Sequence, residues 1–235
     1  MKIIKPIITL FILLSLILNS CTKSDDNQTT PTNLSESPIA KPQFNNSNFG
    51  IYKGVFVGSS GIINVNLNND NTISSTLIIN GVTHNFTTNQ TIQQGQATLV
   101  NFVNGSNSFS FSVGANGSSP TVSNININGH SDAAIIAAKE TSTTIVKCYE
   151  GTYSGGETGI FNAITYGNTM LGLIKSSNNS IYTANGTVNN NQISATGNVS
   201  TGATFIGTLN GYNISGTWIN SQFNLNGTWT GVRTY

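Results

Sequence analysis

Two acidic residues in the C-terminal half are the pair that an acid/base mechanism there would have to use. Glycosidic hydrolysis needs two carboxylates that face each other about 5 to 10 Å apart. Glu150 and Glu157 are the only acidic residues in the segment from Cys148 to Tyr235. Both lie beside glycines, Gly151 and Gly156, in a context typical of turns. We therefore expect two solvated turn residues rather than an acid/base pair.

Histidine, aspartate and cysteine also lack the spacing of a known site. His84 and His130 are far apart and form no zinc motif, and His130 with nearby Asp132 is expected in a surface turn. Asp70 lacks the spaced acidic residues of a calcium loop. Cys148 has no histidine in its half to act as a base, so we expect a buried small residue. The sequence predicts no catalytic residue, metal or cofactor, and we expect a protein that is not an enzyme.

The composition excludes one further class of function. Only 7% of the 235 residues are charged, and the net charge is +1. Nucleic-acid binding by a basic surface needs clustered Lys and Arg, so we expect no nucleic-acid partner. The surface left by this composition is rich in Asn, Thr and Ser. It suits neutral partners, such as an extracellular glycan or a protein.

The first twenty residues have the pattern of an export signal. Lys2 and Lys5 precede a run of mostly apolar residues, 7–18. This run is too short for a membrane span, which needs about 20 apolar residues. The sequence therefore predicts a signal peptide over residues 1–20.

The next residues resemble a lipid-attachment motif. Leu18-Asn19-Ser20-Cys21 resembles the bacterial lipobox. The resemblance implies cleavage before Cys21, a diacylglyceryl group on its thiol and acylation of the new amino terminus. Two or three acyl chains hold a protein durably on a membrane. We therefore expect Cys21 to be the lipidation site and the membrane to be a partner through this anchor.

A short acidic segment follows the predicted anchor. Lys23-Ser24-Asp25-Asp26 resembles the export signal of Bacteroidetes (Flavobacterium-like) surface lipoproteins. The resemblance implies an outer-membrane protein that is exposed on the cell surface. The alternative is that Asp25 and Asp26 only begin a solvated tether. Residues 21–48 show no hydrophobic periodicity and contain Pro31, Pro38 and Pro42, which predicts a flexible, disordered tether.

From residue 49 onward, apolar and polar residues alternate. Ile63, Val65 and Leu67 alternate with asparagines, and Phe109, Phe111 and Val113 alternate with serines. This period of two predicts strands with one buried face. Seven Asn-Gly pairs favour tight hairpin turns between them; these pairs begin at Asn80, Asn104, Asn116, Asn128, Asn185, Asn210 and Asn226.

A repeated motif divides this region into two parts. Tyr52-Lys53-Gly54-Val55-Phe56 returns as Tyr149-Glu150-Gly151-Thr152-Tyr153. We predict an all-β fold of two tandem antiparallel meanders, barrel-like or sandwich-like, over residues 49–143 and 144–235. One larger sheet is the alternative. Residues 132–140 fit either a short helix or a buried final strand of the first unit, and we favour the strand.

The C-terminal unit carries a Gly-Thr-aromatic series. It includes Gly216-Thr217-Trp218 and ends in Gly227-Thr228-Trp229-Thr230-Gly231-Val232-Arg233. This series resembles a β-repeat of Bacteroidetes lipoproteins of unknown function and, more faintly, the eight-stranded barrels of avidins and lipocalins. The second resemblance implies a barrel that holds a ligand. We expect Arg233 to lie over an aromatic ring or to close one end of a barrel, and favour a structural contact over a ligand contact.

Together these features predict a non-catalytic, surface-anchored lipoprotein that serves as a binding or coat module. The alternatives are a self-assembling matrix protein, or an avidin- or lipocalin-like barrel for a small ligand. Capture of carbohydrate would need exposed aromatic rings. The alternation is instead expected to bury most of Phe205, Trp218, Phe223 and Trp229.

Overall fold

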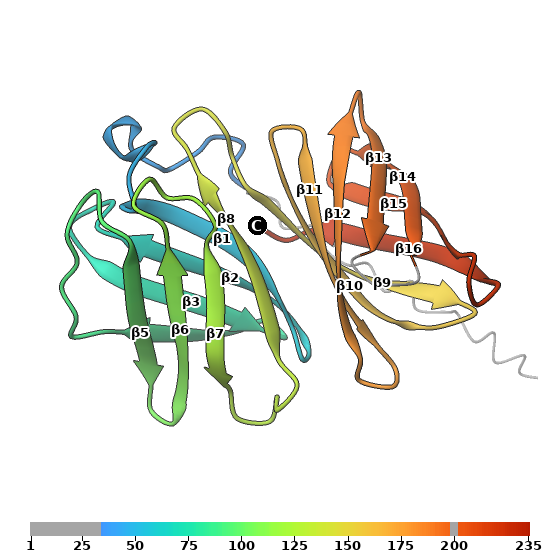
Figure 1. Ribbon diagram of the computed structural model, residues 1–235, viewed down its shortest axis with the longest axis horizontal. Coiled ribbons are helices and arrows are strands. Elements are labelled where there is room, and N and C mark those ends of the chain that lie inside the picture. Colours follow the sequence, from blue (N-terminus) through green and yellow to red (C-terminus); the bar gives the residue numbers. More distant parts are fainter. Residues whose placement is uncertain (1–33, 198–201) are drawn as a thin grey trace, which may run out of the picture.

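The computed structural model describes residues 34–197 and 202–235, which form an all-β protein (Figure 1). A short 3-10 helix, η1 (Pro42–Phe44), precedes the strands. The predicted signal peptide 1–20, the lipidation site Cys21 and the segment Lys23-Ser24-Asp25-Asp26 lie outside the described residues. Among the described residues, no helix is long and apolar enough to span a membrane.

The first unit is an antiparallel meander of eight strands. Its sheet has the order β7-β6-β5-β4-β3-β2-β1-β8, so the last strand returns to pair with the first. Strands β7 and β8 are therefore the two edges of this sheet. The strands are β1 (Gly50–Val57), β2 (Ser60–Leu67), β3 (Ile73–Ile79), β4 (Val82–Thr87), β5 (Thr98–Asn104), β6 (Asn107–Val113), β7 (Thr121–Asn126) and β8 (Ala134–Glu140).

The second unit is a closed eight-stranded barrel. Each strand pairs with the next along the chain, and β16 pairs with β9 to close the ring. The strands are β9 (Lys147–Gly155), β10 (Gly159–Tyr166), β11 (Thr169–Ser176), β12 (Ile181–Asn189), β13 (Gln192–Gly197), β14 (Thr204–Asn210), β15 (Asn213–Asn220) and β16 (Leu225–Arg233). The prediction of two tandem antiparallel units is confirmed, and residues 134–140 form the favoured strand.

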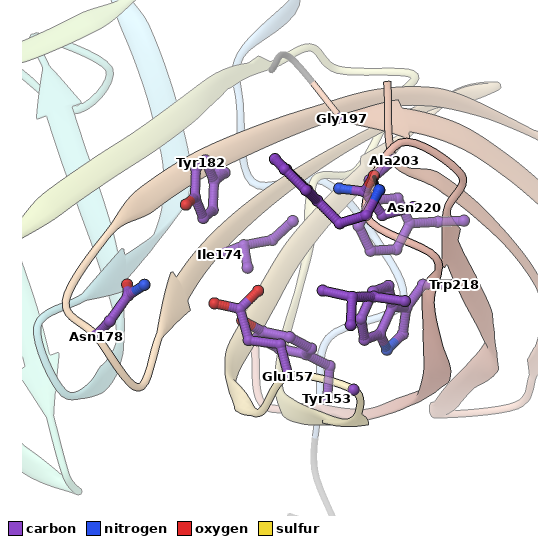
Figure 2. A pocket seen from close by; sticks show the side chains of 13 residues that line it. Tyr153, Glu157, Ile174, Asn178, Tyr182, Gly197, Ala203, Trp218 and Asn220 are labelled. Atoms are coloured by element: carbon purple, nitrogen blue, oxygen red, sulfur yellow. Dashed lines mark hydrogen bonds between the residues drawn. The ribbon is translucent and has the colours of Figure 1, made fainter. Parts of the chain in front are cut away.

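The two units fill their interiors differently. In the first unit, aromatic side chains pack into a continuous core: Tyr52, Phe56, Phe86, Phe102, Phe109 and Phe111. In the barrel, Trp229 and Phe161 pack together with ring centroids 5.0 Å apart. Figure 2 shows the hollow that the barrel's inward-facing side chains leave at one end.

The Asn-Gly pairs occur in two structural contexts, hairpin turns and strand interiors. Asn80 and Gly81 both have positive φ, 49° and 79°, and they join β3 to β4 in a tight hairpin as predicted. The pairs at Asn185 and Asn226 lie inside strands β12 and β16 instead, so the turn prediction is wrong there. A Cβ atom on Gly227 would lie 1.8 Å from the carbonyl oxygen of Ser154. Glycine is needed at this position because the neighbouring strand comes close.

The predicted tether differs from the structure in its second part, residues 34–48. The backbone N–H of Ile39 donates to Glu140 Oε1 at 2.7 Å, and that of Lys41 donates to Asn69 Oδ1 at 2.9 Å. Asn48 is fully buried. Specific hydrogen bonds to distant residues hold this segment, and such bonds leave no hydrophobic periodicity in the sequence. The expectation of a flexible chain up to residue 48 is therefore wrong for residues 34–48.

The units contact each other through their outer faces. A second apolar cluster joins β1, β2 and β8 to the start of the barrel; its buried members are Val55, Val57, Ile62, Ala138, Val146, Cys148, Ile164 and Leu173. This contact explains why every residue of β1 is buried: one face of β1 packs in its own unit and the other packs against the barrel.

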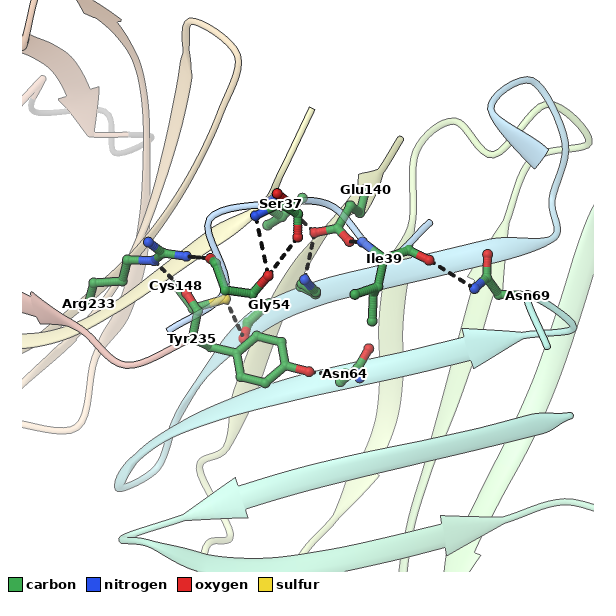
Figure 3. Close-up of polar contacts among 12 residues, drawn as sticks. Ser37, Ile39, Gly54, Asn64, Asn69, Glu140, Cys148, Arg233 and Tyr235 are labelled. Atoms are coloured by element: carbon green, nitrogen blue, oxygen red, sulfur yellow. Dashed lines mark hydrogen bonds and ion pairs between the residues drawn. The ribbon is translucent and has the colours of Figure 1, made fainter. Parts of the chain in front are cut away.

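A buried ion pair lies beside this cluster (Figure 3). Lys53 Nζ lies 2.6 Å from Glu140 Oε2, and both side chains are almost completely buried. Oε2 of Glu140 also accepts a hydrogen bond from the backbone N–H of Val146 at 3.2 Å. Lys53 Nζ lies 5.0 Å from the ring centroid of Tyr235 near the chain's last strand. One carboxylate thus connects β1, β8, the inter-unit linker and the N-terminal segment.

Replacing Glu140 by Gln should destabilise the protein strongly. The change leaves the ammonium group of Lys53 buried without its counter-charge, which typically costs about 3–5 kcal/mol. Urea unfolding followed by circular dichroism measures the loss. The double variant Lys53→Met/Glu140→Gln should recover most of it, because it removes the unpaired ammonium group and keeps an amide oxygen to accept from the backbone N–H groups of Ile39 and Val146. The exposed change Asp132→Asn should have little effect. A Glu140→Gln protein as stable as the wild type would contradict this account.

Candidate functional site

A pocket lies at one open end of the barrel (Figure 2). Its volume is about 620 Å³, which lies within the usual range for sites that bind small molecules. The lining residues come from strand ends and turns around the whole mouth. They are Tyr153, Gly156, Glu157, Ile174, Asn178, Tyr182, Gly197, Ala203, Phe205, Trp218, Asn220, Phe223 and Leu225.

Aromatic rings form much of the pocket wall. Tyr153 and Trp218 meet edge to face with centroids 5.8 Å apart. Trp218 Nε1 donates a hydrogen bond to the carbonyl oxygen of Ser154 at 3.0 Å, which fixes the orientation of the indole. Phe205 packs on Phe161, whose ring contacts Trp229 deeper in the barrel. The wall is therefore held by contacts that exist without a ligand.

The pocket wall also presents a few polar groups. Glu157 in the β9–β10 turn is half-buried, and Figure 2 shows its carboxylate directed into the pocket beside Tyr153. The hydroxyl of Tyr153 is buried, and its oxygen accepts no hydrogen bond among the described residues. Burial raises the pKa of Tyr153, and the nearby charge of Glu157 raises it further. Tyr153 therefore stays neutral and can exchange a hydrogen bond with a bound molecule.

The opposite end of the barrel has a smaller hollow of about 400 Å³. Lys147 contributes to its lining and forms an ion pair with Glu36, with Nζ 3.2 Å from Oε2. Glu36 therefore fastens the N-terminal segment at the end of the barrel away from the aromatic pocket.

The two candidate carboxylates occupy different surroundings. Glu150 lies within β9, half-buried, and accepts a hydrogen bond from Ser60 Oγ at 2.5 Å across the inter-unit contact. Glu157 lies in a turn as predicted, but it lines the aromatic pocket. The expectation of two solvated turn residues is therefore wrong for Glu150, and for Glu157 it is right only about the turn.

The remaining polar candidates make structural contacts. His130 Nδ1 lies 3.2 Å from Ser59 Oγ, and its ring meets Phe56 edge to face. Asp70 accepts hydrogen bonds from Thr72 and Asn66, and these bonds lower the pKa of its carboxyl group. In the described ranges, no group of three or more His, Cys, Asp or Glu side chains gathers as a metal site.

Arg233 lies over an aromatic ring, as predicted, and the ring is that of Tyr212. Its guanidinium carbon lies 5.6 Å from the ring centroid of Tyr212, and the side chain is almost fully buried. Arg233 Nη1 also lies 2.5 Å from Glu36 Oε1. Glu36 is almost 200 residues away in the sequence, so no local sequence pattern predicts this contact.

Phe223 differs most from its predicted environment. Its side chain is 59% exposed and lies at the rim of the pocket. Phe223 belongs to the turn between β15 and β16, where strand alternation does not apply. Phe205, Trp218 and Trp229 are buried as predicted. The sequence pattern did not locate the pocket. It indicates that these strand residues face the barrel interior, but not that one end of the barrel stays open.

No protein-family model matches the chain. No curated protein is significantly similar to it either.

The thiol of Cys148 should be unreactive in the folded protein. Cys148 is fully buried as predicted, and Sγ donates to the carbonyl oxygen of Gly54 at 3.4 Å. Burial raises the pKa of the thiol to about 12, so little thiolate forms at pH 8. In a Cys21→Ser chain, 5,5′-dithiobis(2-nitrobenzoate) should label no thiol before denaturation and one afterwards. Fast labelling of the native protein would contradict this burial.

Proposed function

We propose that this protein is a non-catalytic binding module, lipid-anchored on the outer membrane, whose C-terminal barrel holds a small, largely apolar ligand. The observation that carries the proposal is the pocket of about 620 Å³ at the barrel mouth, with its preformed aromatic wall. Concave, mostly apolar sites with a few convergent polar groups are typical of small-molecule binding.

The position of the N-terminal segment supports an accessible mouth. Glu36 contacts Lys147 and Arg233, which lie where β9 begins and β16 ends. The pocket lies at the other ends of these strands, near Tyr153 and Leu225. An anchor at Cys21 would therefore lead to the end of the barrel away from the ligand. The acidic segment after Cys21 resembles an export signal for surface lipoproteins. Exposure on the cell surface is therefore part of the same proposal.

The alternative of a self-assembling matrix protein has less support from the topology. Edge-to-edge assembly needs unpaired strands. The barrel pairs each of its eight strands on both sides. In the first sheet, the two edge strands β7 and β8 lie close to each other, and β8 also packs against the barrel through Ala138.

The mature chain, residues 21–235 with Cys21→Ser, should bind the neutral fluorophore N-phenyl-1-naphthylamine saturably. A ligand of this size in a preformed apolar pocket is expected to bind with a dissociation constant of about 1–100 μM. Ala203→Phe should weaken binding at least about tenfold, since Ala203 lines the mouth and the larger ring would occupy the pocket. Fluorescence titration measures both constants.

The matched control for this titration is Ile206→Phe. It adds a phenyl ring three residues further along the chain, in β14, at a side chain that is 62% exposed. Its affinity should equal that of the wild type. Absence of saturable binding by the wild type, or equal loss in both variants, would reject the pocket as the binding site.

Protease treatment of intact cells should remove the wild-type protein. We expect the variant with Asp25→Ala and Asp26→Ala to resist until the envelope is opened, because the acidic segment is needed for export to the outer face. Cys21→Ala should release the protein from the membrane fraction. A wild-type protein that is protected in intact cells would place the module inside the envelope.

A further inference from the structure

We propose that the ligand of the barrel mouth is a small organic cation, a quaternary ammonium or protonated amine with an apolar portion. This inference rests on the proposed function and names the chemical class that the same pocket selects. Its basis is the combination of one carboxylate with aromatic rings (Figure 2).

The charge of the pocket has a single sign. Glu157 is the only charged residue among the thirteen that line it, and no Lys, Arg or His is among them. In the barrel unit, Lys147 and Arg233 lie at the opposite end, where both contact Glu36. Lys175 follows the lining residue Ile174 in β11, but alternation along the strand turns its side chain to the other face, and it is not among the lining residues. A carboxylate in partly desolvated surroundings attracts a cation more strongly than it would in water. An anionic ligand would instead meet repulsion from Glu157, with no positively charged side chain among the lining residues to offset it.

The aromatic wall suits the same class of ligand. Five of the lining residues are aromatic: Tyr153, Tyr182, Phe205, Trp218 and Phe223. The faces of such rings attract cations, tryptophan most strongly, and aromatic cages are a recurring means of binding quaternary ammonium groups. Phe223 lies exposed at the rim, where it can cover an entering ligand.

The buried hydroxyl of Tyr153 adds a second polar contact. It lies beside the Glu157 carboxylate, and its oxygen accepts no hydrogen bond among the described residues, which leaves that acceptor for a ligand or water. Its oxygen can accept a hydrogen bond from a protonated amine while Glu157 supplies the counter-charge. The apolar walls formed by Ile174, Ala203 and Leu225 leave space for the uncharged part of the ligand.

Competition against bound N-phenyl-1-naphthylamine tests the inference with three probes of similar size. These are benzyltrimethylammonium, its neutral carbon isostere neopentylbenzene, and the anion phenylacetate, at one fixed ionic strength. In the mature Cys21→Ser chain, benzyltrimethylammonium should bind at least about tenfold more tightly than phenylacetate. Glu157→Gln should weaken the cation about tenfold and change the neutral isostere less than about twofold.

The control variant is Asp132→Asn, which removes the same charge from an exposed residue of the first unit. It should leave all three constants unchanged. Equal binding of cation and anion, or a Glu157→Gln effect that is the same for cation and neutral isostere, overturns the inference while the pocket remains a binding site. If neither the fluorophore nor any probe binds the wild type, the proposed function fails together with the inference.

Discussion

The buried carboxylate of Glu140 constrains the arrangement of the whole molecule. A charge that is removed from water is tolerated only when its partners replace the lost hydration. Glu140 obtains them from the ammonium group of Lys53 and from two backbone N–H groups, those of Ile39 and Val146. These partners belong to β1, to the N-terminal segment and to the linker between the units. None of these segments can move independently without exposing or isolating the charge, so the two units and the segment before them are held together at this point.

The internal repeat falls on the first strand of each unit, and in both units this strand pairs with the last one, although only the second sheet closes. Gly54 and Gly151 occupy the same place in the repeated motif, and each meets the closing strand of its unit. A Cβ atom on Gly54 would lie 2.0 Å from the carbonyl oxygen of Ile136, and one on Gly151 would lie 1.9 Å from that of Thr230. Two positions later, Phe56 fills the first core whereas Tyr153 lines an open pocket. Both units thus need glycine where the first and last strands come close. The aromatic residue two positions later fills a core in the first unit and lines a pocket in the second.

Local patterns predicted much of the fold and little of the site. Alternation along the chain and the repeat at Tyr52 and Tyr149 depend on neighbours in sequence, and they correctly indicated strands and two units. The burial of Cys148 was predicted on a different ground, the absence of a histidine in its unit that could act as a base. The partners of Glu140, the attachment of Glu36 to Arg233 and the pocket around Glu157 depend on residues that meet only after the barrel closes. No periodicity records such contacts, because they are set by tertiary structure.

The pairing of β16 with β9 has a consequence for the order in which the protein can mature. Arg233, two residues from the end of the chain, bonds to Glu36 near its beginning, and Tyr235 covers Lys53. Contacts between such distant residues form late, since the intervening chain must first be brought together. The barrel therefore cannot close until β16 is available to pair with β9, so its closure is a late step of folding.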